Sequence, residues 1–266
     1  MSKLQGVSDT LFIPLVARIF VSKKFPEYFF DERSLALEQY IPDDSIQKKS
    51  SEYSLMASVA RYYNLDSMVQ TFIKENGKCN IIYLGAGFET AYYRLNKQQA
   101  TFYEIDLPDV IAARRTILGE QANEILIAGN IFDMEWTKRI NKSISTLLIV
   151  SGVFHYFKED DVVQFINNIK KVFSNVELVF DATNETGIKY ANKYVQRTGN
   201  ADALMYFYIN DSAEFSKKTG IKLIEERVFF TDARKMLKKK LGLYTRIAMK
   251  IVDDKKRAIL LHFRIN

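Results

Sequence analysis

The sequence predicts an α/β protein with a mostly parallel sheet and helices on both faces. Short apolar runs alternate with helical patterns through the middle of the chain, a glycine turn follows the first run, and two more strand-like runs lie near the C-terminus. Such alternation is typical of βαβ units, whose strands are parallel. With 266 residues, of which 47% are hydrophobic, the chain can form one large domain with a sizeable core.

The first part of the chain is expected to be helical. Residues 11–21 are apolar except for Arg18, and Pro26 and Pro42 limit regular structure in the next segment. Residues 52–76 repeat apolar side chains at helical spacing, and Asn76-Gly77 supplies a stop signal. We therefore expect a long helix directly before the first strand.

The remaining elements are predicted from periodicity and turn residues. We expect strands at 80–84, 101–106, 124–128, 145–151 and 176–181, with helices at about 88–97, 108–119, 134–141 and 159–173. After an irregular stretch at 183–211, we expect a helix at 212–218, a strand at 221–230, a basic helix around 232–241 and a last strand at 258–265.

The stretch NIIYLGAGFETAYYRL, residues 80–95, carries the clearest functional signal. Gly85-Ala86-Gly87 separates a strand from a helix that opens at Thr90, an arrangement that binds nucleotide-like ligands. Asp106 follows Gly85 by 21 residues, where a carboxylate at the end of the next strand can accept hydrogen bonds from ribose hydroxyls. The dinucleotide fingerprint requires a third glycine where Thr90 stands. The pattern favours a nucleoside site, and a simple tight turn is the alternative.

The same residues resemble a known family. Gly85-Ala86-Gly87, Glu89-Thr90, Arg94-Leu95 and the EIDLP segment at 104–108 are similar to the leucine carboxyl methyltransferase superfamily, and within it to the bacterial branch that resembles the tetracenomycin polyketide O-methyltransferase. Glu89 stands where the family usually has Asp. The resemblance implies a class I methyltransferase that uses S-adenosyl-L-methionine, with a Rossmann-like seven-stranded sheet whose last strand is antiparallel.

The resemblance also implies an organisation and a set of cofactor contacts. One methyltransferase domain spans 1–266, with an N-terminal helical cover (1–78), a cofactor-binding core (79–182), a helical lid insertion (183–211) and C-terminal strands and helix (212–266). The implied cofactor contacts are Arg18, Arg61, Gly85, Ala86, Gly87, Glu104, Asp106, Leu107, Asn130, Ile131 and Ser151.

Individual positions carry different expectations. Arg61, and with it Arg18, would bind the methionine carboxylate, because a guanidinium offers a fork of donors; the alternative for both is a helix-surface arginine. Asn130 stands where the family usually has an acid near the adenine, and can still accept a hydrogen bond from an amine. Ser151 stands where the family usually has Glu, which removes a carboxylate from the site.

The acceptor chemistry leaves two alternatives open. A carboxylate acceptor is ionised at neutral pH and requires no general base, so the absence of a catalytic triad is expected. His155 can deprotonate a phenol or alcohol, although a histidine packed beneath its loop is the alternative, and Tyr156 is a second candidate. Four tyrosines in the insertion form either a substrate wall or core packing: Tyr190, Tyr194, Tyr206 and Tyr208.

Composition restricts the partners. The net charge is +6, with basic runs at 217–218 and 234–240 that indicate either a solvated helix face or attraction of an acidic partner. No aromatic residues are interleaved with these runs, which argues against a nucleic-acid groove. No Cys/His cluster has zinc spacing, so we expect no metal. The apolar segment 11–21 is too short to span a bilayer, so we expect no membrane association and a cytoplasmic protein.

The sequence therefore predicts a small-molecule O-methyltransferase that acts on a carboxylate of a polyketide-like or other aromatic acid. A non-catalytic S-adenosylmethionine-binding protein is the alternative that Ser151 and Asn130 motivate. A nicotinamide oxidoreductase is disfavoured by the missing third glycine. Nucleic-acid base methylation is disfavoured because residues 151–156 contain no proline.

Overall fold

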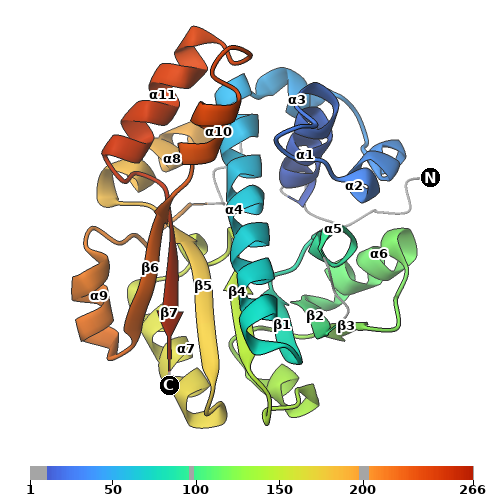
Figure 1. Ribbon diagram of the computed structural model, residues 1–266, viewed down its shortest axis with the longest axis vertical. Coiled ribbons are helices and arrows are strands. Elements are labelled where there is room, and N and C mark those ends of the chain that lie inside the picture. The colour runs from blue at the N-terminus through green and yellow to red at the C-terminus, as the bar shows by residue number, and fades with distance from the viewer. Residues whose placement is uncertain (1–10, 96–98, 198–203, 266) are drawn as a thin grey trace.

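The centre of the molecule is a seven-stranded sheet with the order β3-β2-β1-β4-β5-β7-β6. In this computed structural model, residues 11–95, 99–197 and 204–265 are described (Figure 1). Neighbouring strands from β3 to β5 are parallel, whereas β7 is antiparallel to both β5 and β6. The predicted fold class is therefore confirmed, including the antiparallel strand near the C-terminus.

The strands are β1 (Cys79–Leu84), β2 (Ala100–Asp106), β3 (Glu124–Ala128), β4 (Thr146–Val150), β5 (Val176–Ala182), β6 (Lys222–Val228) and β7 (Ile259–Arg264). The helices are α1 (Phe12–Lys24), α2 (Glu32–Ala36), η2 (Glu38–Tyr40), α3 (Ser45–Lys49), α4 (Glu52–Asn76), α5 (Ala91–Arg94), α6 (Pro108–Leu118), η3 (Glu135–Arg139), η4 (Phe154–Tyr156), α7 (Glu159–Val172), α8 (Glu185–Arg197), α9 (Ser212–Thr219), α10 (Thr231–Met236) and α11 (Leu243–Asp254).

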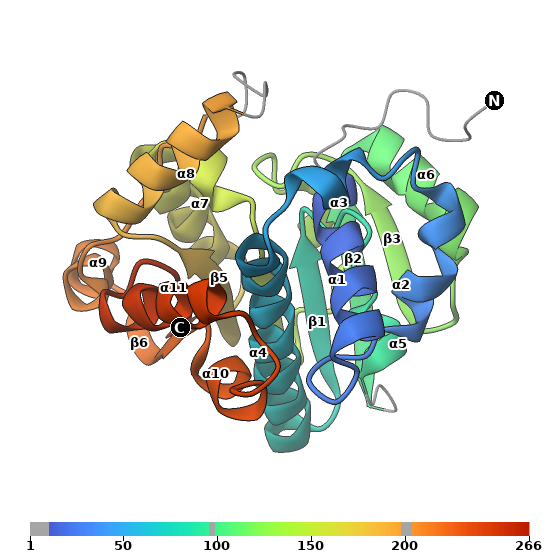
Figure 2. The same cartoon turned by 90° about the horizontal axis from the view of Figure 1, so that it is seen from above.

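The two faces of the sheet build two cores because successive side chains of a strand point to opposite sides. In β1, Ile81 and Tyr83 join a cluster with α1, α4 and α10. Ile82 and Leu84 join the other cluster, with α7 and α9. Figures 1 and 2 show α4 and α1 side by side on the first face.

Helix α4 leads directly into β1 and has the bounds that periodicity predicts. The Ser51 side chain accepts a hydrogen bond from the Ser54 N–H at the first turn, and Gly77 ends the helix with a φ of 63°. The N-terminal segments fold beside this helix: α1 packs on α4, and Arg33 of α2 donates to the Leu118 carbonyl at the end of α6.

Three helices differ from the expectation. The helix expected at 88–97 is reduced to the single turn of α5, because the chain is extended again at Leu95. The segment expected at 134–141 forms only the 3-10 turn η3, where the Trp136 indole N–H bonds back to the Ile131 carbonyl. Helix α11 was not expected, because two of the three residues on its buried face, Thr245 and Asp253, are polar and do not form an apolar face toward the core.

Candidate functional site

The carboxyl ends of the parallel strands form the edge at which the predicted residues meet. β1 lies between β2 and β4, so the connections after β1 and β4 leave the sheet on opposite sides. Ligands of open α/β sheets bind in the crevice at such a switch point. The candidate site is therefore formed by the loops that follow β1, β2, β3 and β4.

The glycine turn after β1 is tied to the neighbouring loops. Gly85 and Gly87 have φ angles of 73° and 50°, which favour glycine. A methyl group at Gly85 would lie 2.4 Å from Cγ2 of Val153, so the loop after β4 packs directly on the turn. Packing against Val153 therefore requires a glycine at position 85, in addition to the tight turn and the close ligand approach that the sequence suggests.

Asp106 joins the turn to the end of β2. Its carboxylate accepts hydrogen bonds from the N–H groups of Gly87 and Leu107, both at 2.7 Å. The side chain is half-buried, and burial raises its pKa. The Asp106 carbonyl in turn accepts the Gly129 N–H at 2.9 Å, which places the loop of Asn130 beside it.

The loop after β3 carries Asn130 and Ile131, whose contact with an adenine stays a prediction. Asn130 is exposed, and its side-chain oxygen accepts the Phe132 N–H at 2.9 Å. Ile131 is buried, and its carbonyl accepts the hydrogen bond from Trp136. Leu107, after β2, is 53% exposed and offers an apolar surface to a ligand.

Arg18 and Glu104 have different places from those expected. Arg18 is 1% exposed and donates to the Ser34 hydroxyl and, at 2.6 Å, to the carbonyl of Phe88. Glu104 is fully buried, 3.3 Å from the Arg114 guanidinium, and burial raises its pKa well above the usual range. Arg18 therefore supports the turn from within the protein, and the alternative of a surface arginine is wrong. A contact of Arg18 or Glu104 with the cofactor stays a prediction.

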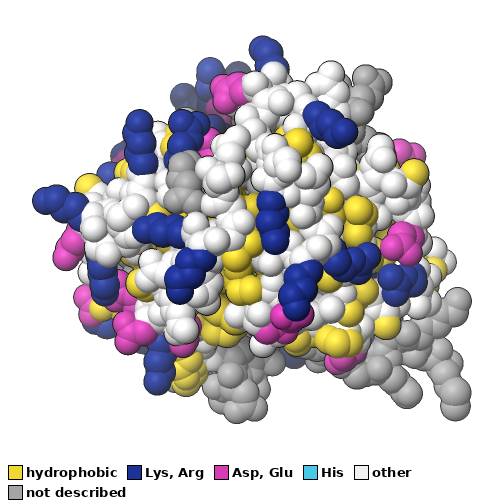
Figure 3. Space-filling view, turned by 90° about the horizontal axis from the view of Figure 1, so that it is seen from below, with side chains coloured by type: hydrophobic (Ala, Val, Ile, Leu, Met, Phe, Trp, Pro, Cys, Tyr) yellow, Lys and Arg dark blue, Asp and Glu magenta, His cyan; other side chains and the backbone are white. Residues whose placement is uncertain are grey.

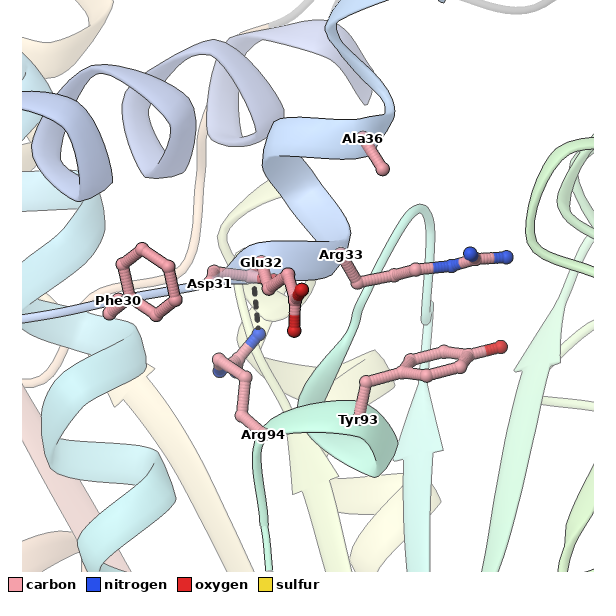
Figure 4. Close-up of a pocket in the computed structure, with 7 residues that line it drawn as sticks. All are labelled: Phe30, Asp31, Glu32, Arg33, Ala36, Tyr93 and Arg94. Atoms are coloured by element: carbon pink, nitrogen blue, oxygen red, sulfur yellow. Dashed lines mark hydrogen bonds and ion pairs between the residues drawn. The ribbon is translucent and has the colours of Figure 1, made fainter.

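A cavity of about 520 Å³ lies between α2 and α5 (Figure 4). It is lined by Phe30, Asp31, Glu32, Arg33, Ala36, Tyr93 and Arg94. Arg94 bonds to Asp31 at 2.9 Å and to Asp66 and Glu89, so its guanidinium nitrogens are all engaged. Among the described residues, the connections after the strands contribute only Tyr93 and Arg94 of α5 to the lining. The ion pairs of Arg94 hold the segment before α2 against the helix that follows the turn.

Arg61 reaches the edge of the sheet from α4. Its Nη1 donates to Asp181 at 2.9 Å, and a methyl group at Gly152 would lie 2.7 Å from the same atom. Helix α4 therefore brings Arg61 to the carboxyl ends of β4 and β5, as a role for Arg61 in the site requires. Its side chain is 15% exposed, so the alternative of an ordinary helix-surface arginine is wrong.

Asp181, at the end of β5, is the residue that sequence reasoning missed. Besides Arg61, its carboxylate accepts the Gly152 N–H at 2.6 Å and lies 3.2 Å from Nε2 of His155. Burial raises the pKa of Asp181, but the Arg61 guanidinium and His155 outweigh burial and hold the pKa well below its usual range. An acid at a strand end, the signal that singled out Asp106, was also present here.

The loop after β4 contains two buried polar atoms that lack a hydrogen-bond partner among the described residues. They are Oγ of Ser151 and Nδ1 of His155. His155 is 7% exposed, whereas Tyr156 is 39% exposed. Most buried polar groups in folded proteins have a hydrogen-bond partner, so these two atoms retain the capacity to bond to a ligand.

The insertion after β5 lies against this loop. The N–H groups of Tyr206 and Phe207 donate to the His155 carbonyl at 2.6 and 3.2 Å. Tyr190, Tyr206 and Tyr208 are 62%, 54% and 41% exposed, so they do not form core packing. The side chain of Tyr194 lies outside the described residues.

These features define a class of protein. A sheet of this order, with a glycine turn after β1, an acid at the end of β2 and an arginine from the preceding helix, has the architecture of class I methyltransferases. The fold is shared with a protein of the DUF574 family from Streptomyces avermitilis, at a TM-score of 0.61 and 12% identity over 94% of this chain and 96% of the other. A proposed methyltransferase from Thermobifida fusca matches at a TM-score of 0.59 and 17% identity over 98% of both chains.

The sequence comparison is more specific. The profile of the leucine carboxyl methyltransferase family matches residues 3–170, and the chain belongs to this family. It is a methyltransferase, and its cofactor is S-adenosylmethionine. The tetracenomycin polyketide synthesis O-methyltransferase TcmP of Streptomyces glaucescens is 21% identical over 195 residues, which cover 73% of this chain and 72% of the relative. Within the described part of the chain, the helices are all too short or too polar to cross a bilayer.

Proposed function

We propose that this methyltransferase transfers the methyl group to an oxygen atom of a small molecule, and that the acceptor is a carboxylate of a polyketide-like or other aromatic acid. The observation that carries the proposal is the meeting of Gly85, Asp106 and Arg61 at one edge of the sheet, linked through Val153 and Gly152. The relationship to a polyketide O-methyltransferase supports oxygen as the acceptor atom.

The residues at this edge have the chemistry that S-adenosylmethionine requires. Arg61 would hold the methionine carboxylate, since its Nε has no hydrogen-bond partner among the described residues. Asp106 would accept from the ribose hydroxyls, and the Ser151 hydroxyl is an unused donor nearby. The remaining proposed contacts are Gly85, Ala86, Gly87, Leu107, Asn130 and Ile131. When bound, the cofactor supplies an electrophilic methyl group.

The protein's part in catalysis is then to orient the acceptor and exclude water. An aligned nucleophile can gain about 7–11 kcal/mol from proximity and orientation alone. We further propose that the described parts of the insertion, residues 183–197 and 204–211, form a lid over the core, and that the helices between residues 12 and 76 cover it from the other side. The rest of the lid expected at 183–211 lies outside the described residues. The exposed Tyr206 and Tyr208 would give the lid an aromatic wall.

A phenolic hydroxyl is the second candidate acceptor, and one observation favours it. If the Nε2–H of His155 donates to Asp181, then Nδ1 carries a lone pair, and this buried atom has no partner among the described residues. A substrate hydroxyl that reached Nδ1 would satisfy this acceptor and lose its proton to it. Asp181 would then hold His155 in the required tautomer.

Transfer of a labelled methyl group to a panel of aromatic acids and phenols tests the proposal. A methyl ester releases its label in base, whereas a methyl ether keeps it. With a carboxylate acceptor, His155→Gln should leave turnover largely unchanged, whereas with a phenol it should lower kcat by about 10²–10⁴-fold. Normal cofactor binding without transfer to any acceptor would contradict the proposal and favour a non-catalytic binding protein.

A further inference from the structure

A basic groove of about 480 Å³ separates helices α10 and α11, away from the glycine turn. It is lined by Thr231, Arg234, Lys235, Lys238, Leu243, Arg246, Ile247 and Lys250. Five of these residues are cationic, and no acidic side chain is among them. Three residues of the basic run that the sequence shows at 234–240, namely Arg234, Lys235 and Lys238, therefore line a concave surface.

Much of this charge is not neutralised by the protein. Arg234 pairs with Asp253 at 3.1 Å, and Lys250 pairs with Asp254. For Lys235, Lys238 and Arg246, no ion pair is found within the described residues. Three cations without an ion pair among the described residues therefore border one groove and attract an anionic partner.

An apolar stripe runs along the same helix. Leu243, Ile247 and Ile251 are 68%, 51% and 44% exposed, and their four-residue spacing places them on one face of α11. Met249, on the opposite side, is fully buried. The exposed face of α11 thus combines aliphatic side chains with flanking cations, the complement of a helix that is apolar on one face and acidic at its margins.

The shape and charge of the groove distinguish among occupants. A second copy bound through the same surface about a two-fold axis would bring two basic grooves together. Nucleic-acid phosphates would leave the aliphatic stripe unused, and a flat bilayer does not enter a groove between two helices. A cylindrical helix does, and α11, with 12 residues, offers about 18 Å of length, or roughly three turns of a partner helix.

We propose that the groove between α10 and α11 binds an acidic amphipathic helix of a partner protein. The inference goes beyond methyl transfer and does not depend on it. The groove nevertheless shares an end of the molecule with the candidate site, since Val228 at the end of β6 pairs with Ile259, which pairs with Ala182 at the end of β5. α10 therefore begins at the same edge as the candidate site.

The test uses the full-length protein and a fluorescent synthetic helix, with leucines on one face and glutamates flanking them. Anisotropy titrations should show saturable binding that weakens as salt is raised. Lys235→Glu with Lys238→Glu should weaken binding by about tenfold or more, because both side chains are exposed and border the groove. Ile247→Ser should also weaken it, with no change in net charge.

A matched control is needed because basic side chains also lie elsewhere. Figure 3, which views the molecule from below, shows Lys and Arg scattered over that face with Asp and Glu between them. Lys217→Glu with Lys222→Glu makes the same charge change on α9 and β6, where both residues are exposed, and should leave affinity nearly unchanged. An equal loss in the control, or no peptide binding, would overturn the proposal. So would Lys235- and Lys238-dependent binding to phosphatidylserine vesicles or duplex DNA in place of the peptide.

Discussion

Removal of the Arg61 guanidinium should destabilise the protein strongly, because it leaves Asp181 charged and buried. Arg61→Met keeps the length of the side chain and removes its charge. Asp181 is 6% exposed and 2.9 Å from Nη1 of Arg61, and breaking such a buried pair costs about 3–5 kcal/mol. Arg61 itself is 15% exposed, so solvent screening favours the lower end, about 3 kcal/mol.

The double variant Arg61→Met with Asp181→Asn provides the matched comparison. It removes both charges, while the asparagine oxygen can still accept the Gly152 N–H. The double variant should therefore lose less free energy of unfolding than the two single variants lose in total. Urea unfolding of the four proteins without cofactor gives the coupling free energy. Losses that add to within about 0.5 kcal/mol would refute the pairing.

The pH dependence has a definite sign. The pKa of Asp181 is held below its unfolded value of about 3.9, so its stabilising contribution is present at neutral pH and is lost only when pH falls through the lower folded pKa. In Arg61→Met, burial dominates and the pKa of Asp181 should rise. The variant should then lose stability as pH rises from about 4, so the gap to wild type should widen toward neutral pH.

Three further predictions concern the turn and its support. Gly85→Ala should lower the free energy of unfolding by about 2 kcal/mol or more, because alanine is strained at a left-handed φ and overpacks against Val153. Adding Val153→Ala should restore part of this loss in chemical unfolding, and no rescue would mean that the two residues do not touch. Asp106→Ala should weaken the binding of S-adenosylmethionine by about 1.5–3 kcal/mol in calorimetry, and the binding of adenosine equally, since both ligands carry the ribose. Unchanged affinities would show that Asp106 is not part of the site. The raised pKa of Glu104 means that folding favours its protonated form, so this residue lowers the stability of wild type as pH rises above about 4.3. Glu104→Gln should remove this contribution and reduce the loss of stability with pH in urea unfolding at acidic and alkaline pH, and an unchanged pH dependence would contradict the assignment.

The sheet could be predicted because buried parallel strands are continuous apolar runs bounded by turn residues. Each expected strand end lies within two residues of the observed one. Helix α11 escaped prediction because its buried face includes Thr245 and Asp253, whereas its aliphatic stripe faces solvent.

The candidate site was only partly predictable. Asp106 follows a recognisable strand–turn–helix, but the partner of Arg61 lies 120 positions further along the chain, which local spacing cannot reveal. Arg18 looked like a lone cation in an apolar run, since its bonds to Ser34 and Phe88 exist only in the folded chain. Long-range pairing of buried charges is the information that the sequence pattern lacked.

The most direct test of the site is a titration of S-adenosylmethionine, S-adenosylhomocysteine and adenosine into wild type and Arg61→Lys. Lysine keeps the charge beside Asp181 but loses the guanidinium fork. The exposed Arg115→Lys, on α6, is the control. The account predicts that Arg61→Lys weakens both methionine-containing ligands to a similar extent and leaves adenosine almost unchanged, while Arg115→Lys affects none. Unchanged affinity for all three ligands, or an equal loss for adenosine, would contradict a methionine carboxylate held by Arg61.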